Sequence, residues 1–382
     1  MQNFEFYNPT KVVFGEGEIR RLSEFVPKAK ILLLYGGGSI KQNGVYEQVK
    51  NALYGHELYE VSGVQPNPTY DKAMEAVELI RREKIEFILA VGGGSVIDSA
   101  KFISLAVPYK GEPWNILTNH EQVYAEAIPF GCVLTLPATG SEMNCWFVLS
   151  RGDQKLSAGS PLLFPKFSIL DPKATLSLDR RQIGNGVVDA FVHVMEQYLT
   201  YPNNAPLQDR FAESILSTLM EEGPKTLMKP TEYEPRANHM WSATMALSGV
   251  IGAGMPFDLA THAIGHELTA LYGIDHARTL ALIFPAVMWV MREEKREKIN
   301  QYAERVLKLK GSDQELLQGS IRKTVTFFET MGLPTKLSAY QIKEDVIEKV
   351  IKRFEERGIT LLGERQQVTM NKVREILRVA LQ

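Results

Sequence analysis

Cysteine is scarce in this sequence, and long apolar stretches are missing from it. Cys132 and Cys145 are the only cysteines among 382 residues, and they form no closely spaced pair that would indicate a disulfide framework. No apolar run approaches the length of a membrane span, and the opening Met1-Gln2-Asn3-Phe4-Glu5 is unlike a signal peptide. We therefore expect a cytoplasmic protein with reduced thiols and no membrane partner.

An excess of charge of either sign is also lacking. The formal net charge is −2, which gives no indication of a nucleic-acid partner. Hydrophobic residues make up 45% of the chain and charged residues 23%, as in ordinary globular proteins. Because 382 residues exceed what one core normally holds, the length predicts two domains.

The first half of the chain alternates short apolar runs with helical patterns. The runs expected to be strands, buried on both faces, are residues 31–35, 87–91, 132–136 and 167–170. Helices are expected at about 44–53 and 96–107. The alternation predicts an α/β domain with a parallel sheet over residues 1–180. Phe4–Phe14 alternates as well, which indicates an edge strand or a hairpin that could also pair across a dimer.

In the second half, residues 181–382, the strand pattern nearly vanishes. Helical periodicity covers residues 206–228, 235–250, 277–291 and 316–331, with Gly and Pro between these stretches. The charge-rich stretch 295–310 is expected to be a solvated face. We predict an all-helical C-terminal domain.

Glycine-rich turns follow two of the predicted strands. They are Gly36-Gly37-Gly38-Ser39 and Gly92-Gly93-Gly94-Ser95, and a third strand end carries Thr135, Leu136, Thr139 and Ser141. Such turns let the backbone and the next helix N-terminus approach an anion, so this sheet edge is a candidate nucleotide site. One such turn alone could be a merely flexible connection. Neither turn has the Gly-x-Gly-x-x-Gly fingerprint, because the third position is Lys41 or Ile97. Lys41 and the lack of a nearby acid favour NADP over NAD.

Ionisable residues recur at helical spacing within apolar stretches of the second half. Asp189 and His193 lie four apart, His262 and His266 lie four apart, and His276 follows shortly after. Residues four apart share one helix face, so each pair offers two side chains to one point. Each pair alone could be ordinary core histidines, but together they favour a divalent metal held by one carboxylate and two or three imidazoles. A zinc-protease motif is excluded, because Ala263 rather than Glu follows His262.

These motifs together resemble the group III, iron-containing alcohol dehydrogenases over nearly the whole chain. The resemblance rests on residues 92–98, residues 135–142, Asp189–His193, His262–His266 and Asp275-His276. The Tyr35–Ser39 turn is similar to that of the NADPH-dependent butanol dehydrogenase and aldehyde reductase branch. The resemblance implies an α/β dinucleotide domain followed by a helical metal domain, as in dehydroquinate synthase, and a homodimer built partly through the N-terminal strand.

The resemblance also implies roles for individual residues. The implied metal ligands are Asp189, His193, His262 and His276, with His266 near the substrate. The implied cofactor contacts include Asp98, Thr135, Thr139, Ser141 and Lys155. Some NAD-using relatives have an Asn contact where this chain has Trp146, so that contact is not carried over.

The expected reaction is hydride transfer between NADP(H) and a small aldehyde or alcohol. A metal such as Fe²⁺ or Zn²⁺ would polarise the carbonyl, and His266 would relay a proton or merely orient His262. We count Asp98 with His266 among the catalytic candidates. Apolar Met255, Phe257 and Trp289 favour an uncharged aldehyde over the phosphorylated substrate of a cyclase-like lyase. The sequence is also compatible with a glycerol-dehydrogenase-like NAD enzyme or a non-catalytic nucleotide-binding protein.

Overall fold

A computed structural model describes residues 1–119 and 124–382 of the chain. The chain divides into two compact units. The sheet unit comprises Tyr7–Leu178 and Thr231–Thr244, and the helical unit comprises Met1–Phe6, Asp179–Pro230 and Met245–Gln382. That residues 1–180 and 181–382 are two separate folding domains stays a prediction.

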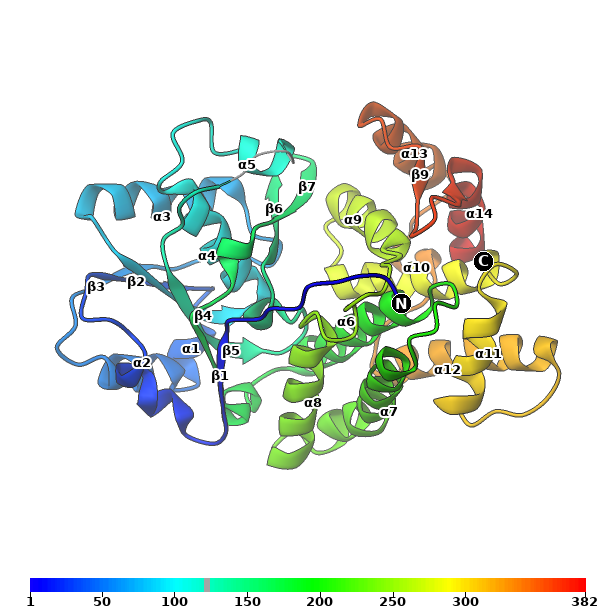
Figure 1. The fold of residues 1–382 in the computed structure, drawn as a ribbon, viewed down its shortest axis with the longest axis horizontal. Helices are drawn as coiled ribbons and strands as arrows, with labels where there is room; N and C mark the ends of the chain where they lie inside the picture. Colours follow the sequence, from blue (N-terminus) through cyan, green and yellow to red (C-terminus); the bar gives the residue numbers. More distant parts are fainter. Residues whose placement is uncertain (120–123) are drawn as a thin grey trace. The chain divides into compact units, whose positions relative to one another are not determined.

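A six-stranded parallel sheet forms the centre of the sheet unit (Figure 1). Its order is β1-β8-β5-β4-β2-β3, and every neighbouring pair is parallel. The strands are β1 (Lys11–Phe14), β2 (Ile31–Tyr35), β3 (Leu58–Val61), β4 (Phe87–Gly93), β5 (Phe130–Leu136) and β8 (Phe167–Leu170). Strands β5, β4 and β2 are neighbours, so their carboxyl ends lie along one edge of the sheet.

Helices cover both faces of the sheet, which explains why its strands are continuous apolar runs. On one face, alternate residues of β2, β4 and β5 pack with α3 (Tyr70–Glu83) and α4 (Gly94–Ala106). On the other face, the intervening residues pack with η1 (Glu18–Glu24) and α2 (Val45–Ala52). The shorter elements of this unit are α1 (Ser39–Gln42), α5 (Asn115–Thr118), η2 (Ser141–Met143), η3 (Pro161–Leu163) and η4 (Pro172–Thr175).

The edges of this unit differ from the sequence-based prediction. Only the last four residues of Phe4–Phe14 form a strand, and because β1 pairs in parallel with β8 at the sheet edge, the hairpin alternative is wrong. Two features were not predicted. One is β3, and the other is an antiparallel hairpin of β6 (Trp146–Arg151) and β7 (Gln154–Gly159).

The helical unit consists of helices apart from one two-residue strand pair in the part of the chain described (Figure 1). Its elements are α6 (Arg180–Tyr198), α7 (Pro206–Met228), the end of α8 (Tyr233–Ala246), α9 (Ala260–Tyr272), α10 (His276–Val290), α11 (Arg296–Arg305), α12 (Asp313–Thr330), η5 (Leu337–Tyr340), α13 (Val346–Glu356), β9 (Leu361–Leu362), β10 (Val368–Thr369) and α14 (Met370–Leu381). The four predicted helices of this half are all present, and α7 has the predicted bounds.

Helix α6 begins at a capping box, in which Asp179 Oδ1 accepts from the Gln182 backbone N–H at 2.7 Å. Helices α9, α10, α13 and α14 share one apolar core. In the described part of the chain, no helix is both long and apolar enough to cross a membrane. The predicted fold class, a parallel α/β sheet with a helical C-terminal part, is confirmed.

Candidate metal centre and nucleotide-binding edge

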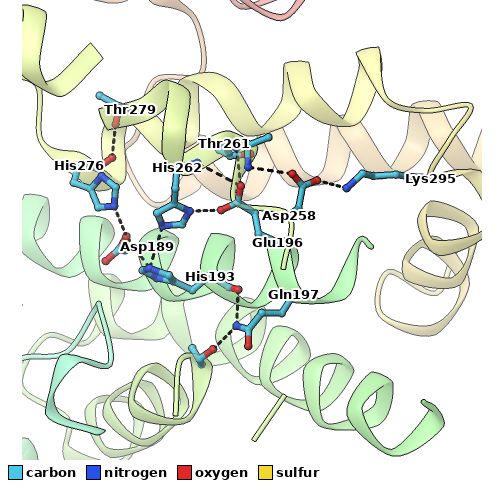
Figure 2. Close-up of polar contacts among 12 residues, drawn as sticks. Asp189, His193, Glu196, Gln197, Asp258, Thr261, His262, His276, Thr279 and Lys295 are labelled. Carbon is cyan, nitrogen blue, oxygen red and sulfur yellow. Dashed lines mark hydrogen bonds and ion pairs between the residues drawn. The ribbon is translucent and has the colours of Figure 1, made fainter. Parts of the chain in front are cut away.

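Three side chains from three helices bring ligand atoms together in the helical unit. Asp189 lies in the middle of α6, His262 in the first turn of α9, and His276 is the first residue of α10. One ligand atom from each lies within 4.8 Å of the other two. Asp189 and His262 are buried, and the His276 side chain is 21% exposed. Figure 2 shows all three side chains directed toward one point.

His193, one turn after Asp189 on α6, completes the group (Figure 2). Its Nε2 lies 3.0 Å from His262 Nε2, and its Nδ1 lies 3.7 Å from Asp189 Oδ1. Burial, and secondarily the neighbouring His262, hold the pKa of His193 well below its usual range. The imidazole is therefore neutral at pH 7, which is the form that binds a metal.

The chemistry of this donor set fits a divalent transition metal. Two imidazole nitrogens face each other at 3.0 Å beside a buried carboxylate, and a cation between these ligand atoms would hold them together. One carboxylate and three imidazoles suit Fe²⁺ and Zn²⁺ equally. That all four residues are ligands stays a prediction.

Glu196 is a buried neighbour of this group that the sequence analysis missed. Its carboxylate contacts His262 Nδ1, and its other oxygen accepts from the Thr261 backbone N–H at 2.6 Å. Its position three residues after His193, within an apolar helix, is a signal that could have drawn attention to it. The contact comes from a residue 66 positions away in the chain, so spacing alone does not reveal it.

The start of α10 is held by polar contacts that fix the position of His276. Asp275 precedes it and accepts hydrogen bonds from Arg181 at 2.6 Å and Asn185 at 2.7 Å. Asp275 is therefore hydrogen-bonded to the amino-terminal part of α6. Thr279 Oγ1 donates to the His276 carbonyl at 2.7 Å, which anchors the first turn further.

His266 lies beside the donor group and is half-buried. Its ring centroid is 4.9 Å from that of His276 and 6.2 Å from that of His262. Its catalytic role stays a prediction.

Trp289, expected near the substrate, lies at the opposite end of α10 from His276. At 1.5 Å per residue, the two are about 20 Å apart along the helix, so that expectation is wrong.

In the sheet unit, the predicted cofactor residues gather along the edge formed by the carboxyl ends of β2, β4 and β5. Gly36–Ser39 follows β2, Gly92–Ser95 spans the junction of β4 and α4, and Thr135 and Leu136 end β5. A Cβ on Gly94 would lie 2.5 Å from Thr139 Oγ1, so the second turn and the third strand end are in close contact.

The start of α4 has the properties of an anion site. Its N-cap residue is Gly93, which has no side chain to satisfy the free backbone N–H groups of the first turn. In the glycine turn after β2, a Cβ on Gly37 or Gly38 would meet nothing within 4 Å. This edge therefore fits the phosphates of a dinucleotide. The individual cofactor contacts stay predictions.

Asp98 is half-buried and bonds to a polar network behind this edge. Its carboxylate accepts from Ser141 Oγ at 2.6 Å and from the Val148 N–H at 3.0 Å, and burial raises its pKa. Lys101, which the sequence analysis missed, donates to Ser141 Oγ at 2.8 Å. It also donates to Asn144 Oδ1 and the Trp146 carbonyl, at 2.9 and 2.7 Å.

Lys155 lies on β7, and its ammonium donates to Asn67 Oδ1 at 2.9 Å.

One expectation for the first glycine turn needs correction. An acid does lie beside Tyr35, because Glu60 of the neighbouring β3 accepts from the Tyr35 hydroxyl at 3.1 Å. The Glu60 carboxylate also accepts from Tyr46 and Lys50, so it is occupied by protein donors.

Comparison with known proteins identifies the family. The family model for iron-containing alcohol dehydrogenases matches residues 9–172, and the model of that family's C-terminal part matches residues 184–381. The chain belongs to the iron-containing alcohol dehydrogenase family. It is 50% identical to the NADPH-dependent aldehyde reductase YqhD of Escherichia coli (strain K12), with 100% of both chains covered. It is 40% identical to the probable NADH-dependent butanol dehydrogenase 1 of Bacillus subtilis (strain 168), again with 100% of both covered.

Solved structures of family members have the same fold. The crystal structure of YqhD from E. coli K-12 matches with a TM-score of 0.98 at 49% identity, covering 100% of this chain and 99% of that one. The NADH-dependent butanol dehydrogenase A of Thermotoga maritima matches with a TM-score of 0.96 at 37% identity, with the same coverage. The expected membership of this family is thereby confirmed.

Proposed function

We propose that the protein is a metal-dependent oxidoreductase that transfers hydride between NADP(H) and short- to medium-chain aldehydes or primary alcohols. The observation that carries this proposal is the convergence of Asp189, His193, His262 and His276 in a chain of this family. A cyclase-like lyase, a glycerol-dehydrogenase-like NAD enzyme and a purely nucleotide-binding protein are less well supported. The two relatives compared above by sequence carry the names of an aldehyde reductase and a butanol dehydrogenase.

When bound, a divalent metal supplies a Lewis acid for the substrate oxygen, and NADP(H) supplies or accepts the hydride. Asp189, His193, His262 and His276 would hold the metal, and the burial of the first three limits the access of water to it. The single carboxylate offsets part of the cation's charge, which leaves the centre electrophilic toward a carbonyl oxygen.

His266 would transfer the proton that the alcohol product requires. It is half-buried and lies beside His276, so it can reach both the donor group and solvent. The alternative is that His266 only orients His262, one turn earlier on α9. Metal content of a His266 variant separates the two roles.

At the nucleotide edge, the free N–H groups at the start of α4 would bind the pyrophosphate. Thr135 and Thr139 offer hydroxyl donors to the same ligand, and Ser141, whose hydroxyl donates to Asp98, would lie beside it. Asp98, counted among the catalytic candidates, would act by holding Ser141, whose hydroxyl it binds at 2.6 Å. Lys155 would contact the nicotinamide half of the cofactor.

NADP is proposed over NAD because of the first glycine turn. Lys41 lies over the rings of Tyr35 and Tyr46, at 5.3 and 4.9 Å from their centroids, and the nearby Tyr35 hydroxyl raises its pKa. The charged ammonium beside open glycines suits a 2′-phosphate. The glutamate beside this turn, Glu60, is already bonded to the two tyrosine hydroxyls.

We also propose a homodimer in the cytoplasm. Phe4, Phe6 and Tyr7 are 50–72% exposed, which is unusual for aromatic side chains and suits a subunit contact. Cys132 and Cys145 are free thiols, as expected in a reducing compartment.

The test is NADPH oxidation with butanal, followed at 340 nm before and after chelation. We expect turnover with NADPH, weaker turnover with NADH, loss of activity on chelation and recovery with Fe²⁺ or Zn²⁺. Equal kcat/KM with the two nucleotides would contradict the NADP assignment. No turnover of any short aldehyde by metal-loaded protein would contradict the proposed reaction.

A further inference from the structure

The buried carboxylate of Glu196 divides its two oxygens between two different tasks. Glu196 lies in α6, three residues after His193, and is only 3% exposed. Its Oε1 accepts from the backbone N–H groups of Thr261 and His262, at 2.6 and 3.3 Å. Its Oε2 contacts the Nδ1 of the His262 ring (Figure 2). One side chain therefore contacts both the backbone and the ring of the same histidine.

Glu196 is held in place through both its carboxylate and its backbone. Oε1 satisfies two of the free N–H groups at the start of α9, a position that favours negative charge. The Glu196 carbonyl accepts from the Asp258 N–H at 3.2 Å. Asp258 caps the Ala260 N–H at 3.0 Å and pairs with the buried Lys295 (Figure 2). Glu196 is thus held in place independently of the His262 ring.

A carboxylate can only accept hydrogen bonds, so its partner must donate. We propose that Glu196 is a positioning residue that keeps the proton of His262 on Nδ1 and thereby leaves Nε2 free to bind the metal. The inference rests on the proposed function only in placing a metal on this donor set.

Exchange of Glu196 for glutamine tests this proposal with almost no change of shape. Two backbone donors face Oε1, so the amide oxygen of the new side chain takes that place and its NH₂ group turns toward Nδ1. The NH₂ group is a donor, so Nδ1 becomes the acceptor and the proton moves to Nε2. Metal binding at Nε2 then requires this proton to leave Nε2. If the proton returns to Nδ1, the hydrogen bond from the amide NH₂ group to Nδ1 is lost.

The measurement is the Zn²⁺ dissociation constant of the full chain, from competition with a chromophoric chelator. We expect Glu196→Gln to weaken Zn²⁺ binding about 10- to 100-fold. The matched control is Glu213→Gln in the same unit, where the carboxylate accepts from Tyr198, Gln301 and Arg305. This control should leave the Zn²⁺ dissociation constant unchanged. Equal Zn²⁺ affinity of Glu196→Gln and the unaltered protein would overturn the proposal.

A second measurement decides the matter even if Glu196→Gln fails to fold. The tautomer of His262 is read from ¹⁵N shifts of the histidine rings in the unaltered, metal-free protein, assigned by comparison with His262→Asn. The proposal requires the proton on Nδ1, and a proton on Nε2 would overturn it. Neither readout involves an aldehyde or NADPH, so both stand apart from a failure of the proposed reaction.

Discussion

Replacing Lys101 by methionine is expected to destabilise the sheet unit through the network beneath the nucleotide edge. The Lys101 side chain is fully buried, and its ammonium has three acceptors, which are Ser141 Oγ, Asn144 Oδ1 and the Trp146 carbonyl. Burial lowers the pKa of Lys101 to about 8, so the group is charged at pH 7. Methionine fills a similar volume but offers no donor.

The expected loss in the free energy of unfolding follows from the polar groups that Lys101→Met leaves without a partner. Lys101→Met would take a donor from three acceptors, and each buried polar group left without its partner typically costs about 1–3 kcal/mol. Asp98 would lose its nearby cation but keep two donors, Ser141 Oγ and the Val148 N–H, so we expect the lower end of that range. Burial also raises the pKa of Asp98, which lets it take up a proton and limits the loss further. For three acceptors at the lower end of that range, the expected loss is about 3 kcal/mol.

The assay is urea unfolding at pH 7 with the unaltered protein, Lys101→Met and the exposed control Lys352→Met, whose side chain is 76% exposed. The control should stay within about 0.5 kcal/mol of the unaltered protein. In a double-mutant cycle with Asp98→Asn, the combined loss should fall short of the sum by about 1–2 kcal/mol. A loss below about 1 kcal/mol for Lys101→Met, or strict additivity with Asp98→Asn, would refute the reasoning.

Because Lys101 is buried, we also expect its contribution to the free energy of unfolding to depend on pH. The folded-state pKa of about 8 lies below the ordinary value of 10.5, so above pH 8 the unfolded chain binds more protons than the folded one. The contribution of this lysine to stability therefore rises with pH between about 8 and 10.5. The free energy of unfolding of the unaltered protein, relative to Lys101→Met, should increase over that range. A decrease would contradict the assignment.

Further predictions concern single residues. His266→Ala should lower kcat about 10²- to 10⁴-fold while metal content measured by plasma mass spectrometry stays near one per chain; loss of the metal would instead make His266 structural. Gly94→Ala should lower the unfolding temperature and weaken NADPH binding, because its Cβ would meet Thr139 Oγ1 at 2.5 Å. Gly37→Ala, whose Cβ meets nothing within 4 Å, should leave the unfolding temperature unchanged, and an equal effect of both changes would contradict this account. Burial raises the pKa of Cys132 to about 12, so a thiol reagent at pH 8 should modify at most Cys145 until denaturant is added. Rapid modification of both cysteines in the folded protein would contradict this prediction.

The parts of the fold that the sequence predicted well are those that a local pattern specifies. The strands β2, β4, β5 and β8 are buried on both faces, so they appear as continuous apolar runs within a residue or two of their bounds. Strand β3 was missed because it is only partly buried at the sheet edge. The β6–β7 hairpin was missed because polar and apolar residues mix along it.

The same distinction holds at the candidate site. Asp189 and His193 are visible in the sequence because they lie four apart in an apolar helix. The sequence analysis missed Glu196, Lys101 and Glu60, because each contacts a residue on another helix, strand or loop. Spacing along the sequence does not reveal such contacts. Trp289 was misplaced because an apolar residue in the right helix can still lie several turns from the site.

The central claim is that one metal ion at the four-residue donor group is required for NADPH-dependent aldehyde reduction. The most direct measurement is the rate of NADPH oxidation with butanal as metal-free protein is titrated with Zn²⁺ or Fe²⁺ under anaerobic conditions. The account predicts a rate that rises linearly to one metal per chain and then levels off, and that stays near zero in Asp189→Ala. Full turnover without metal, or unaltered turnover and metal binding in Asp189→Ala, would contradict it.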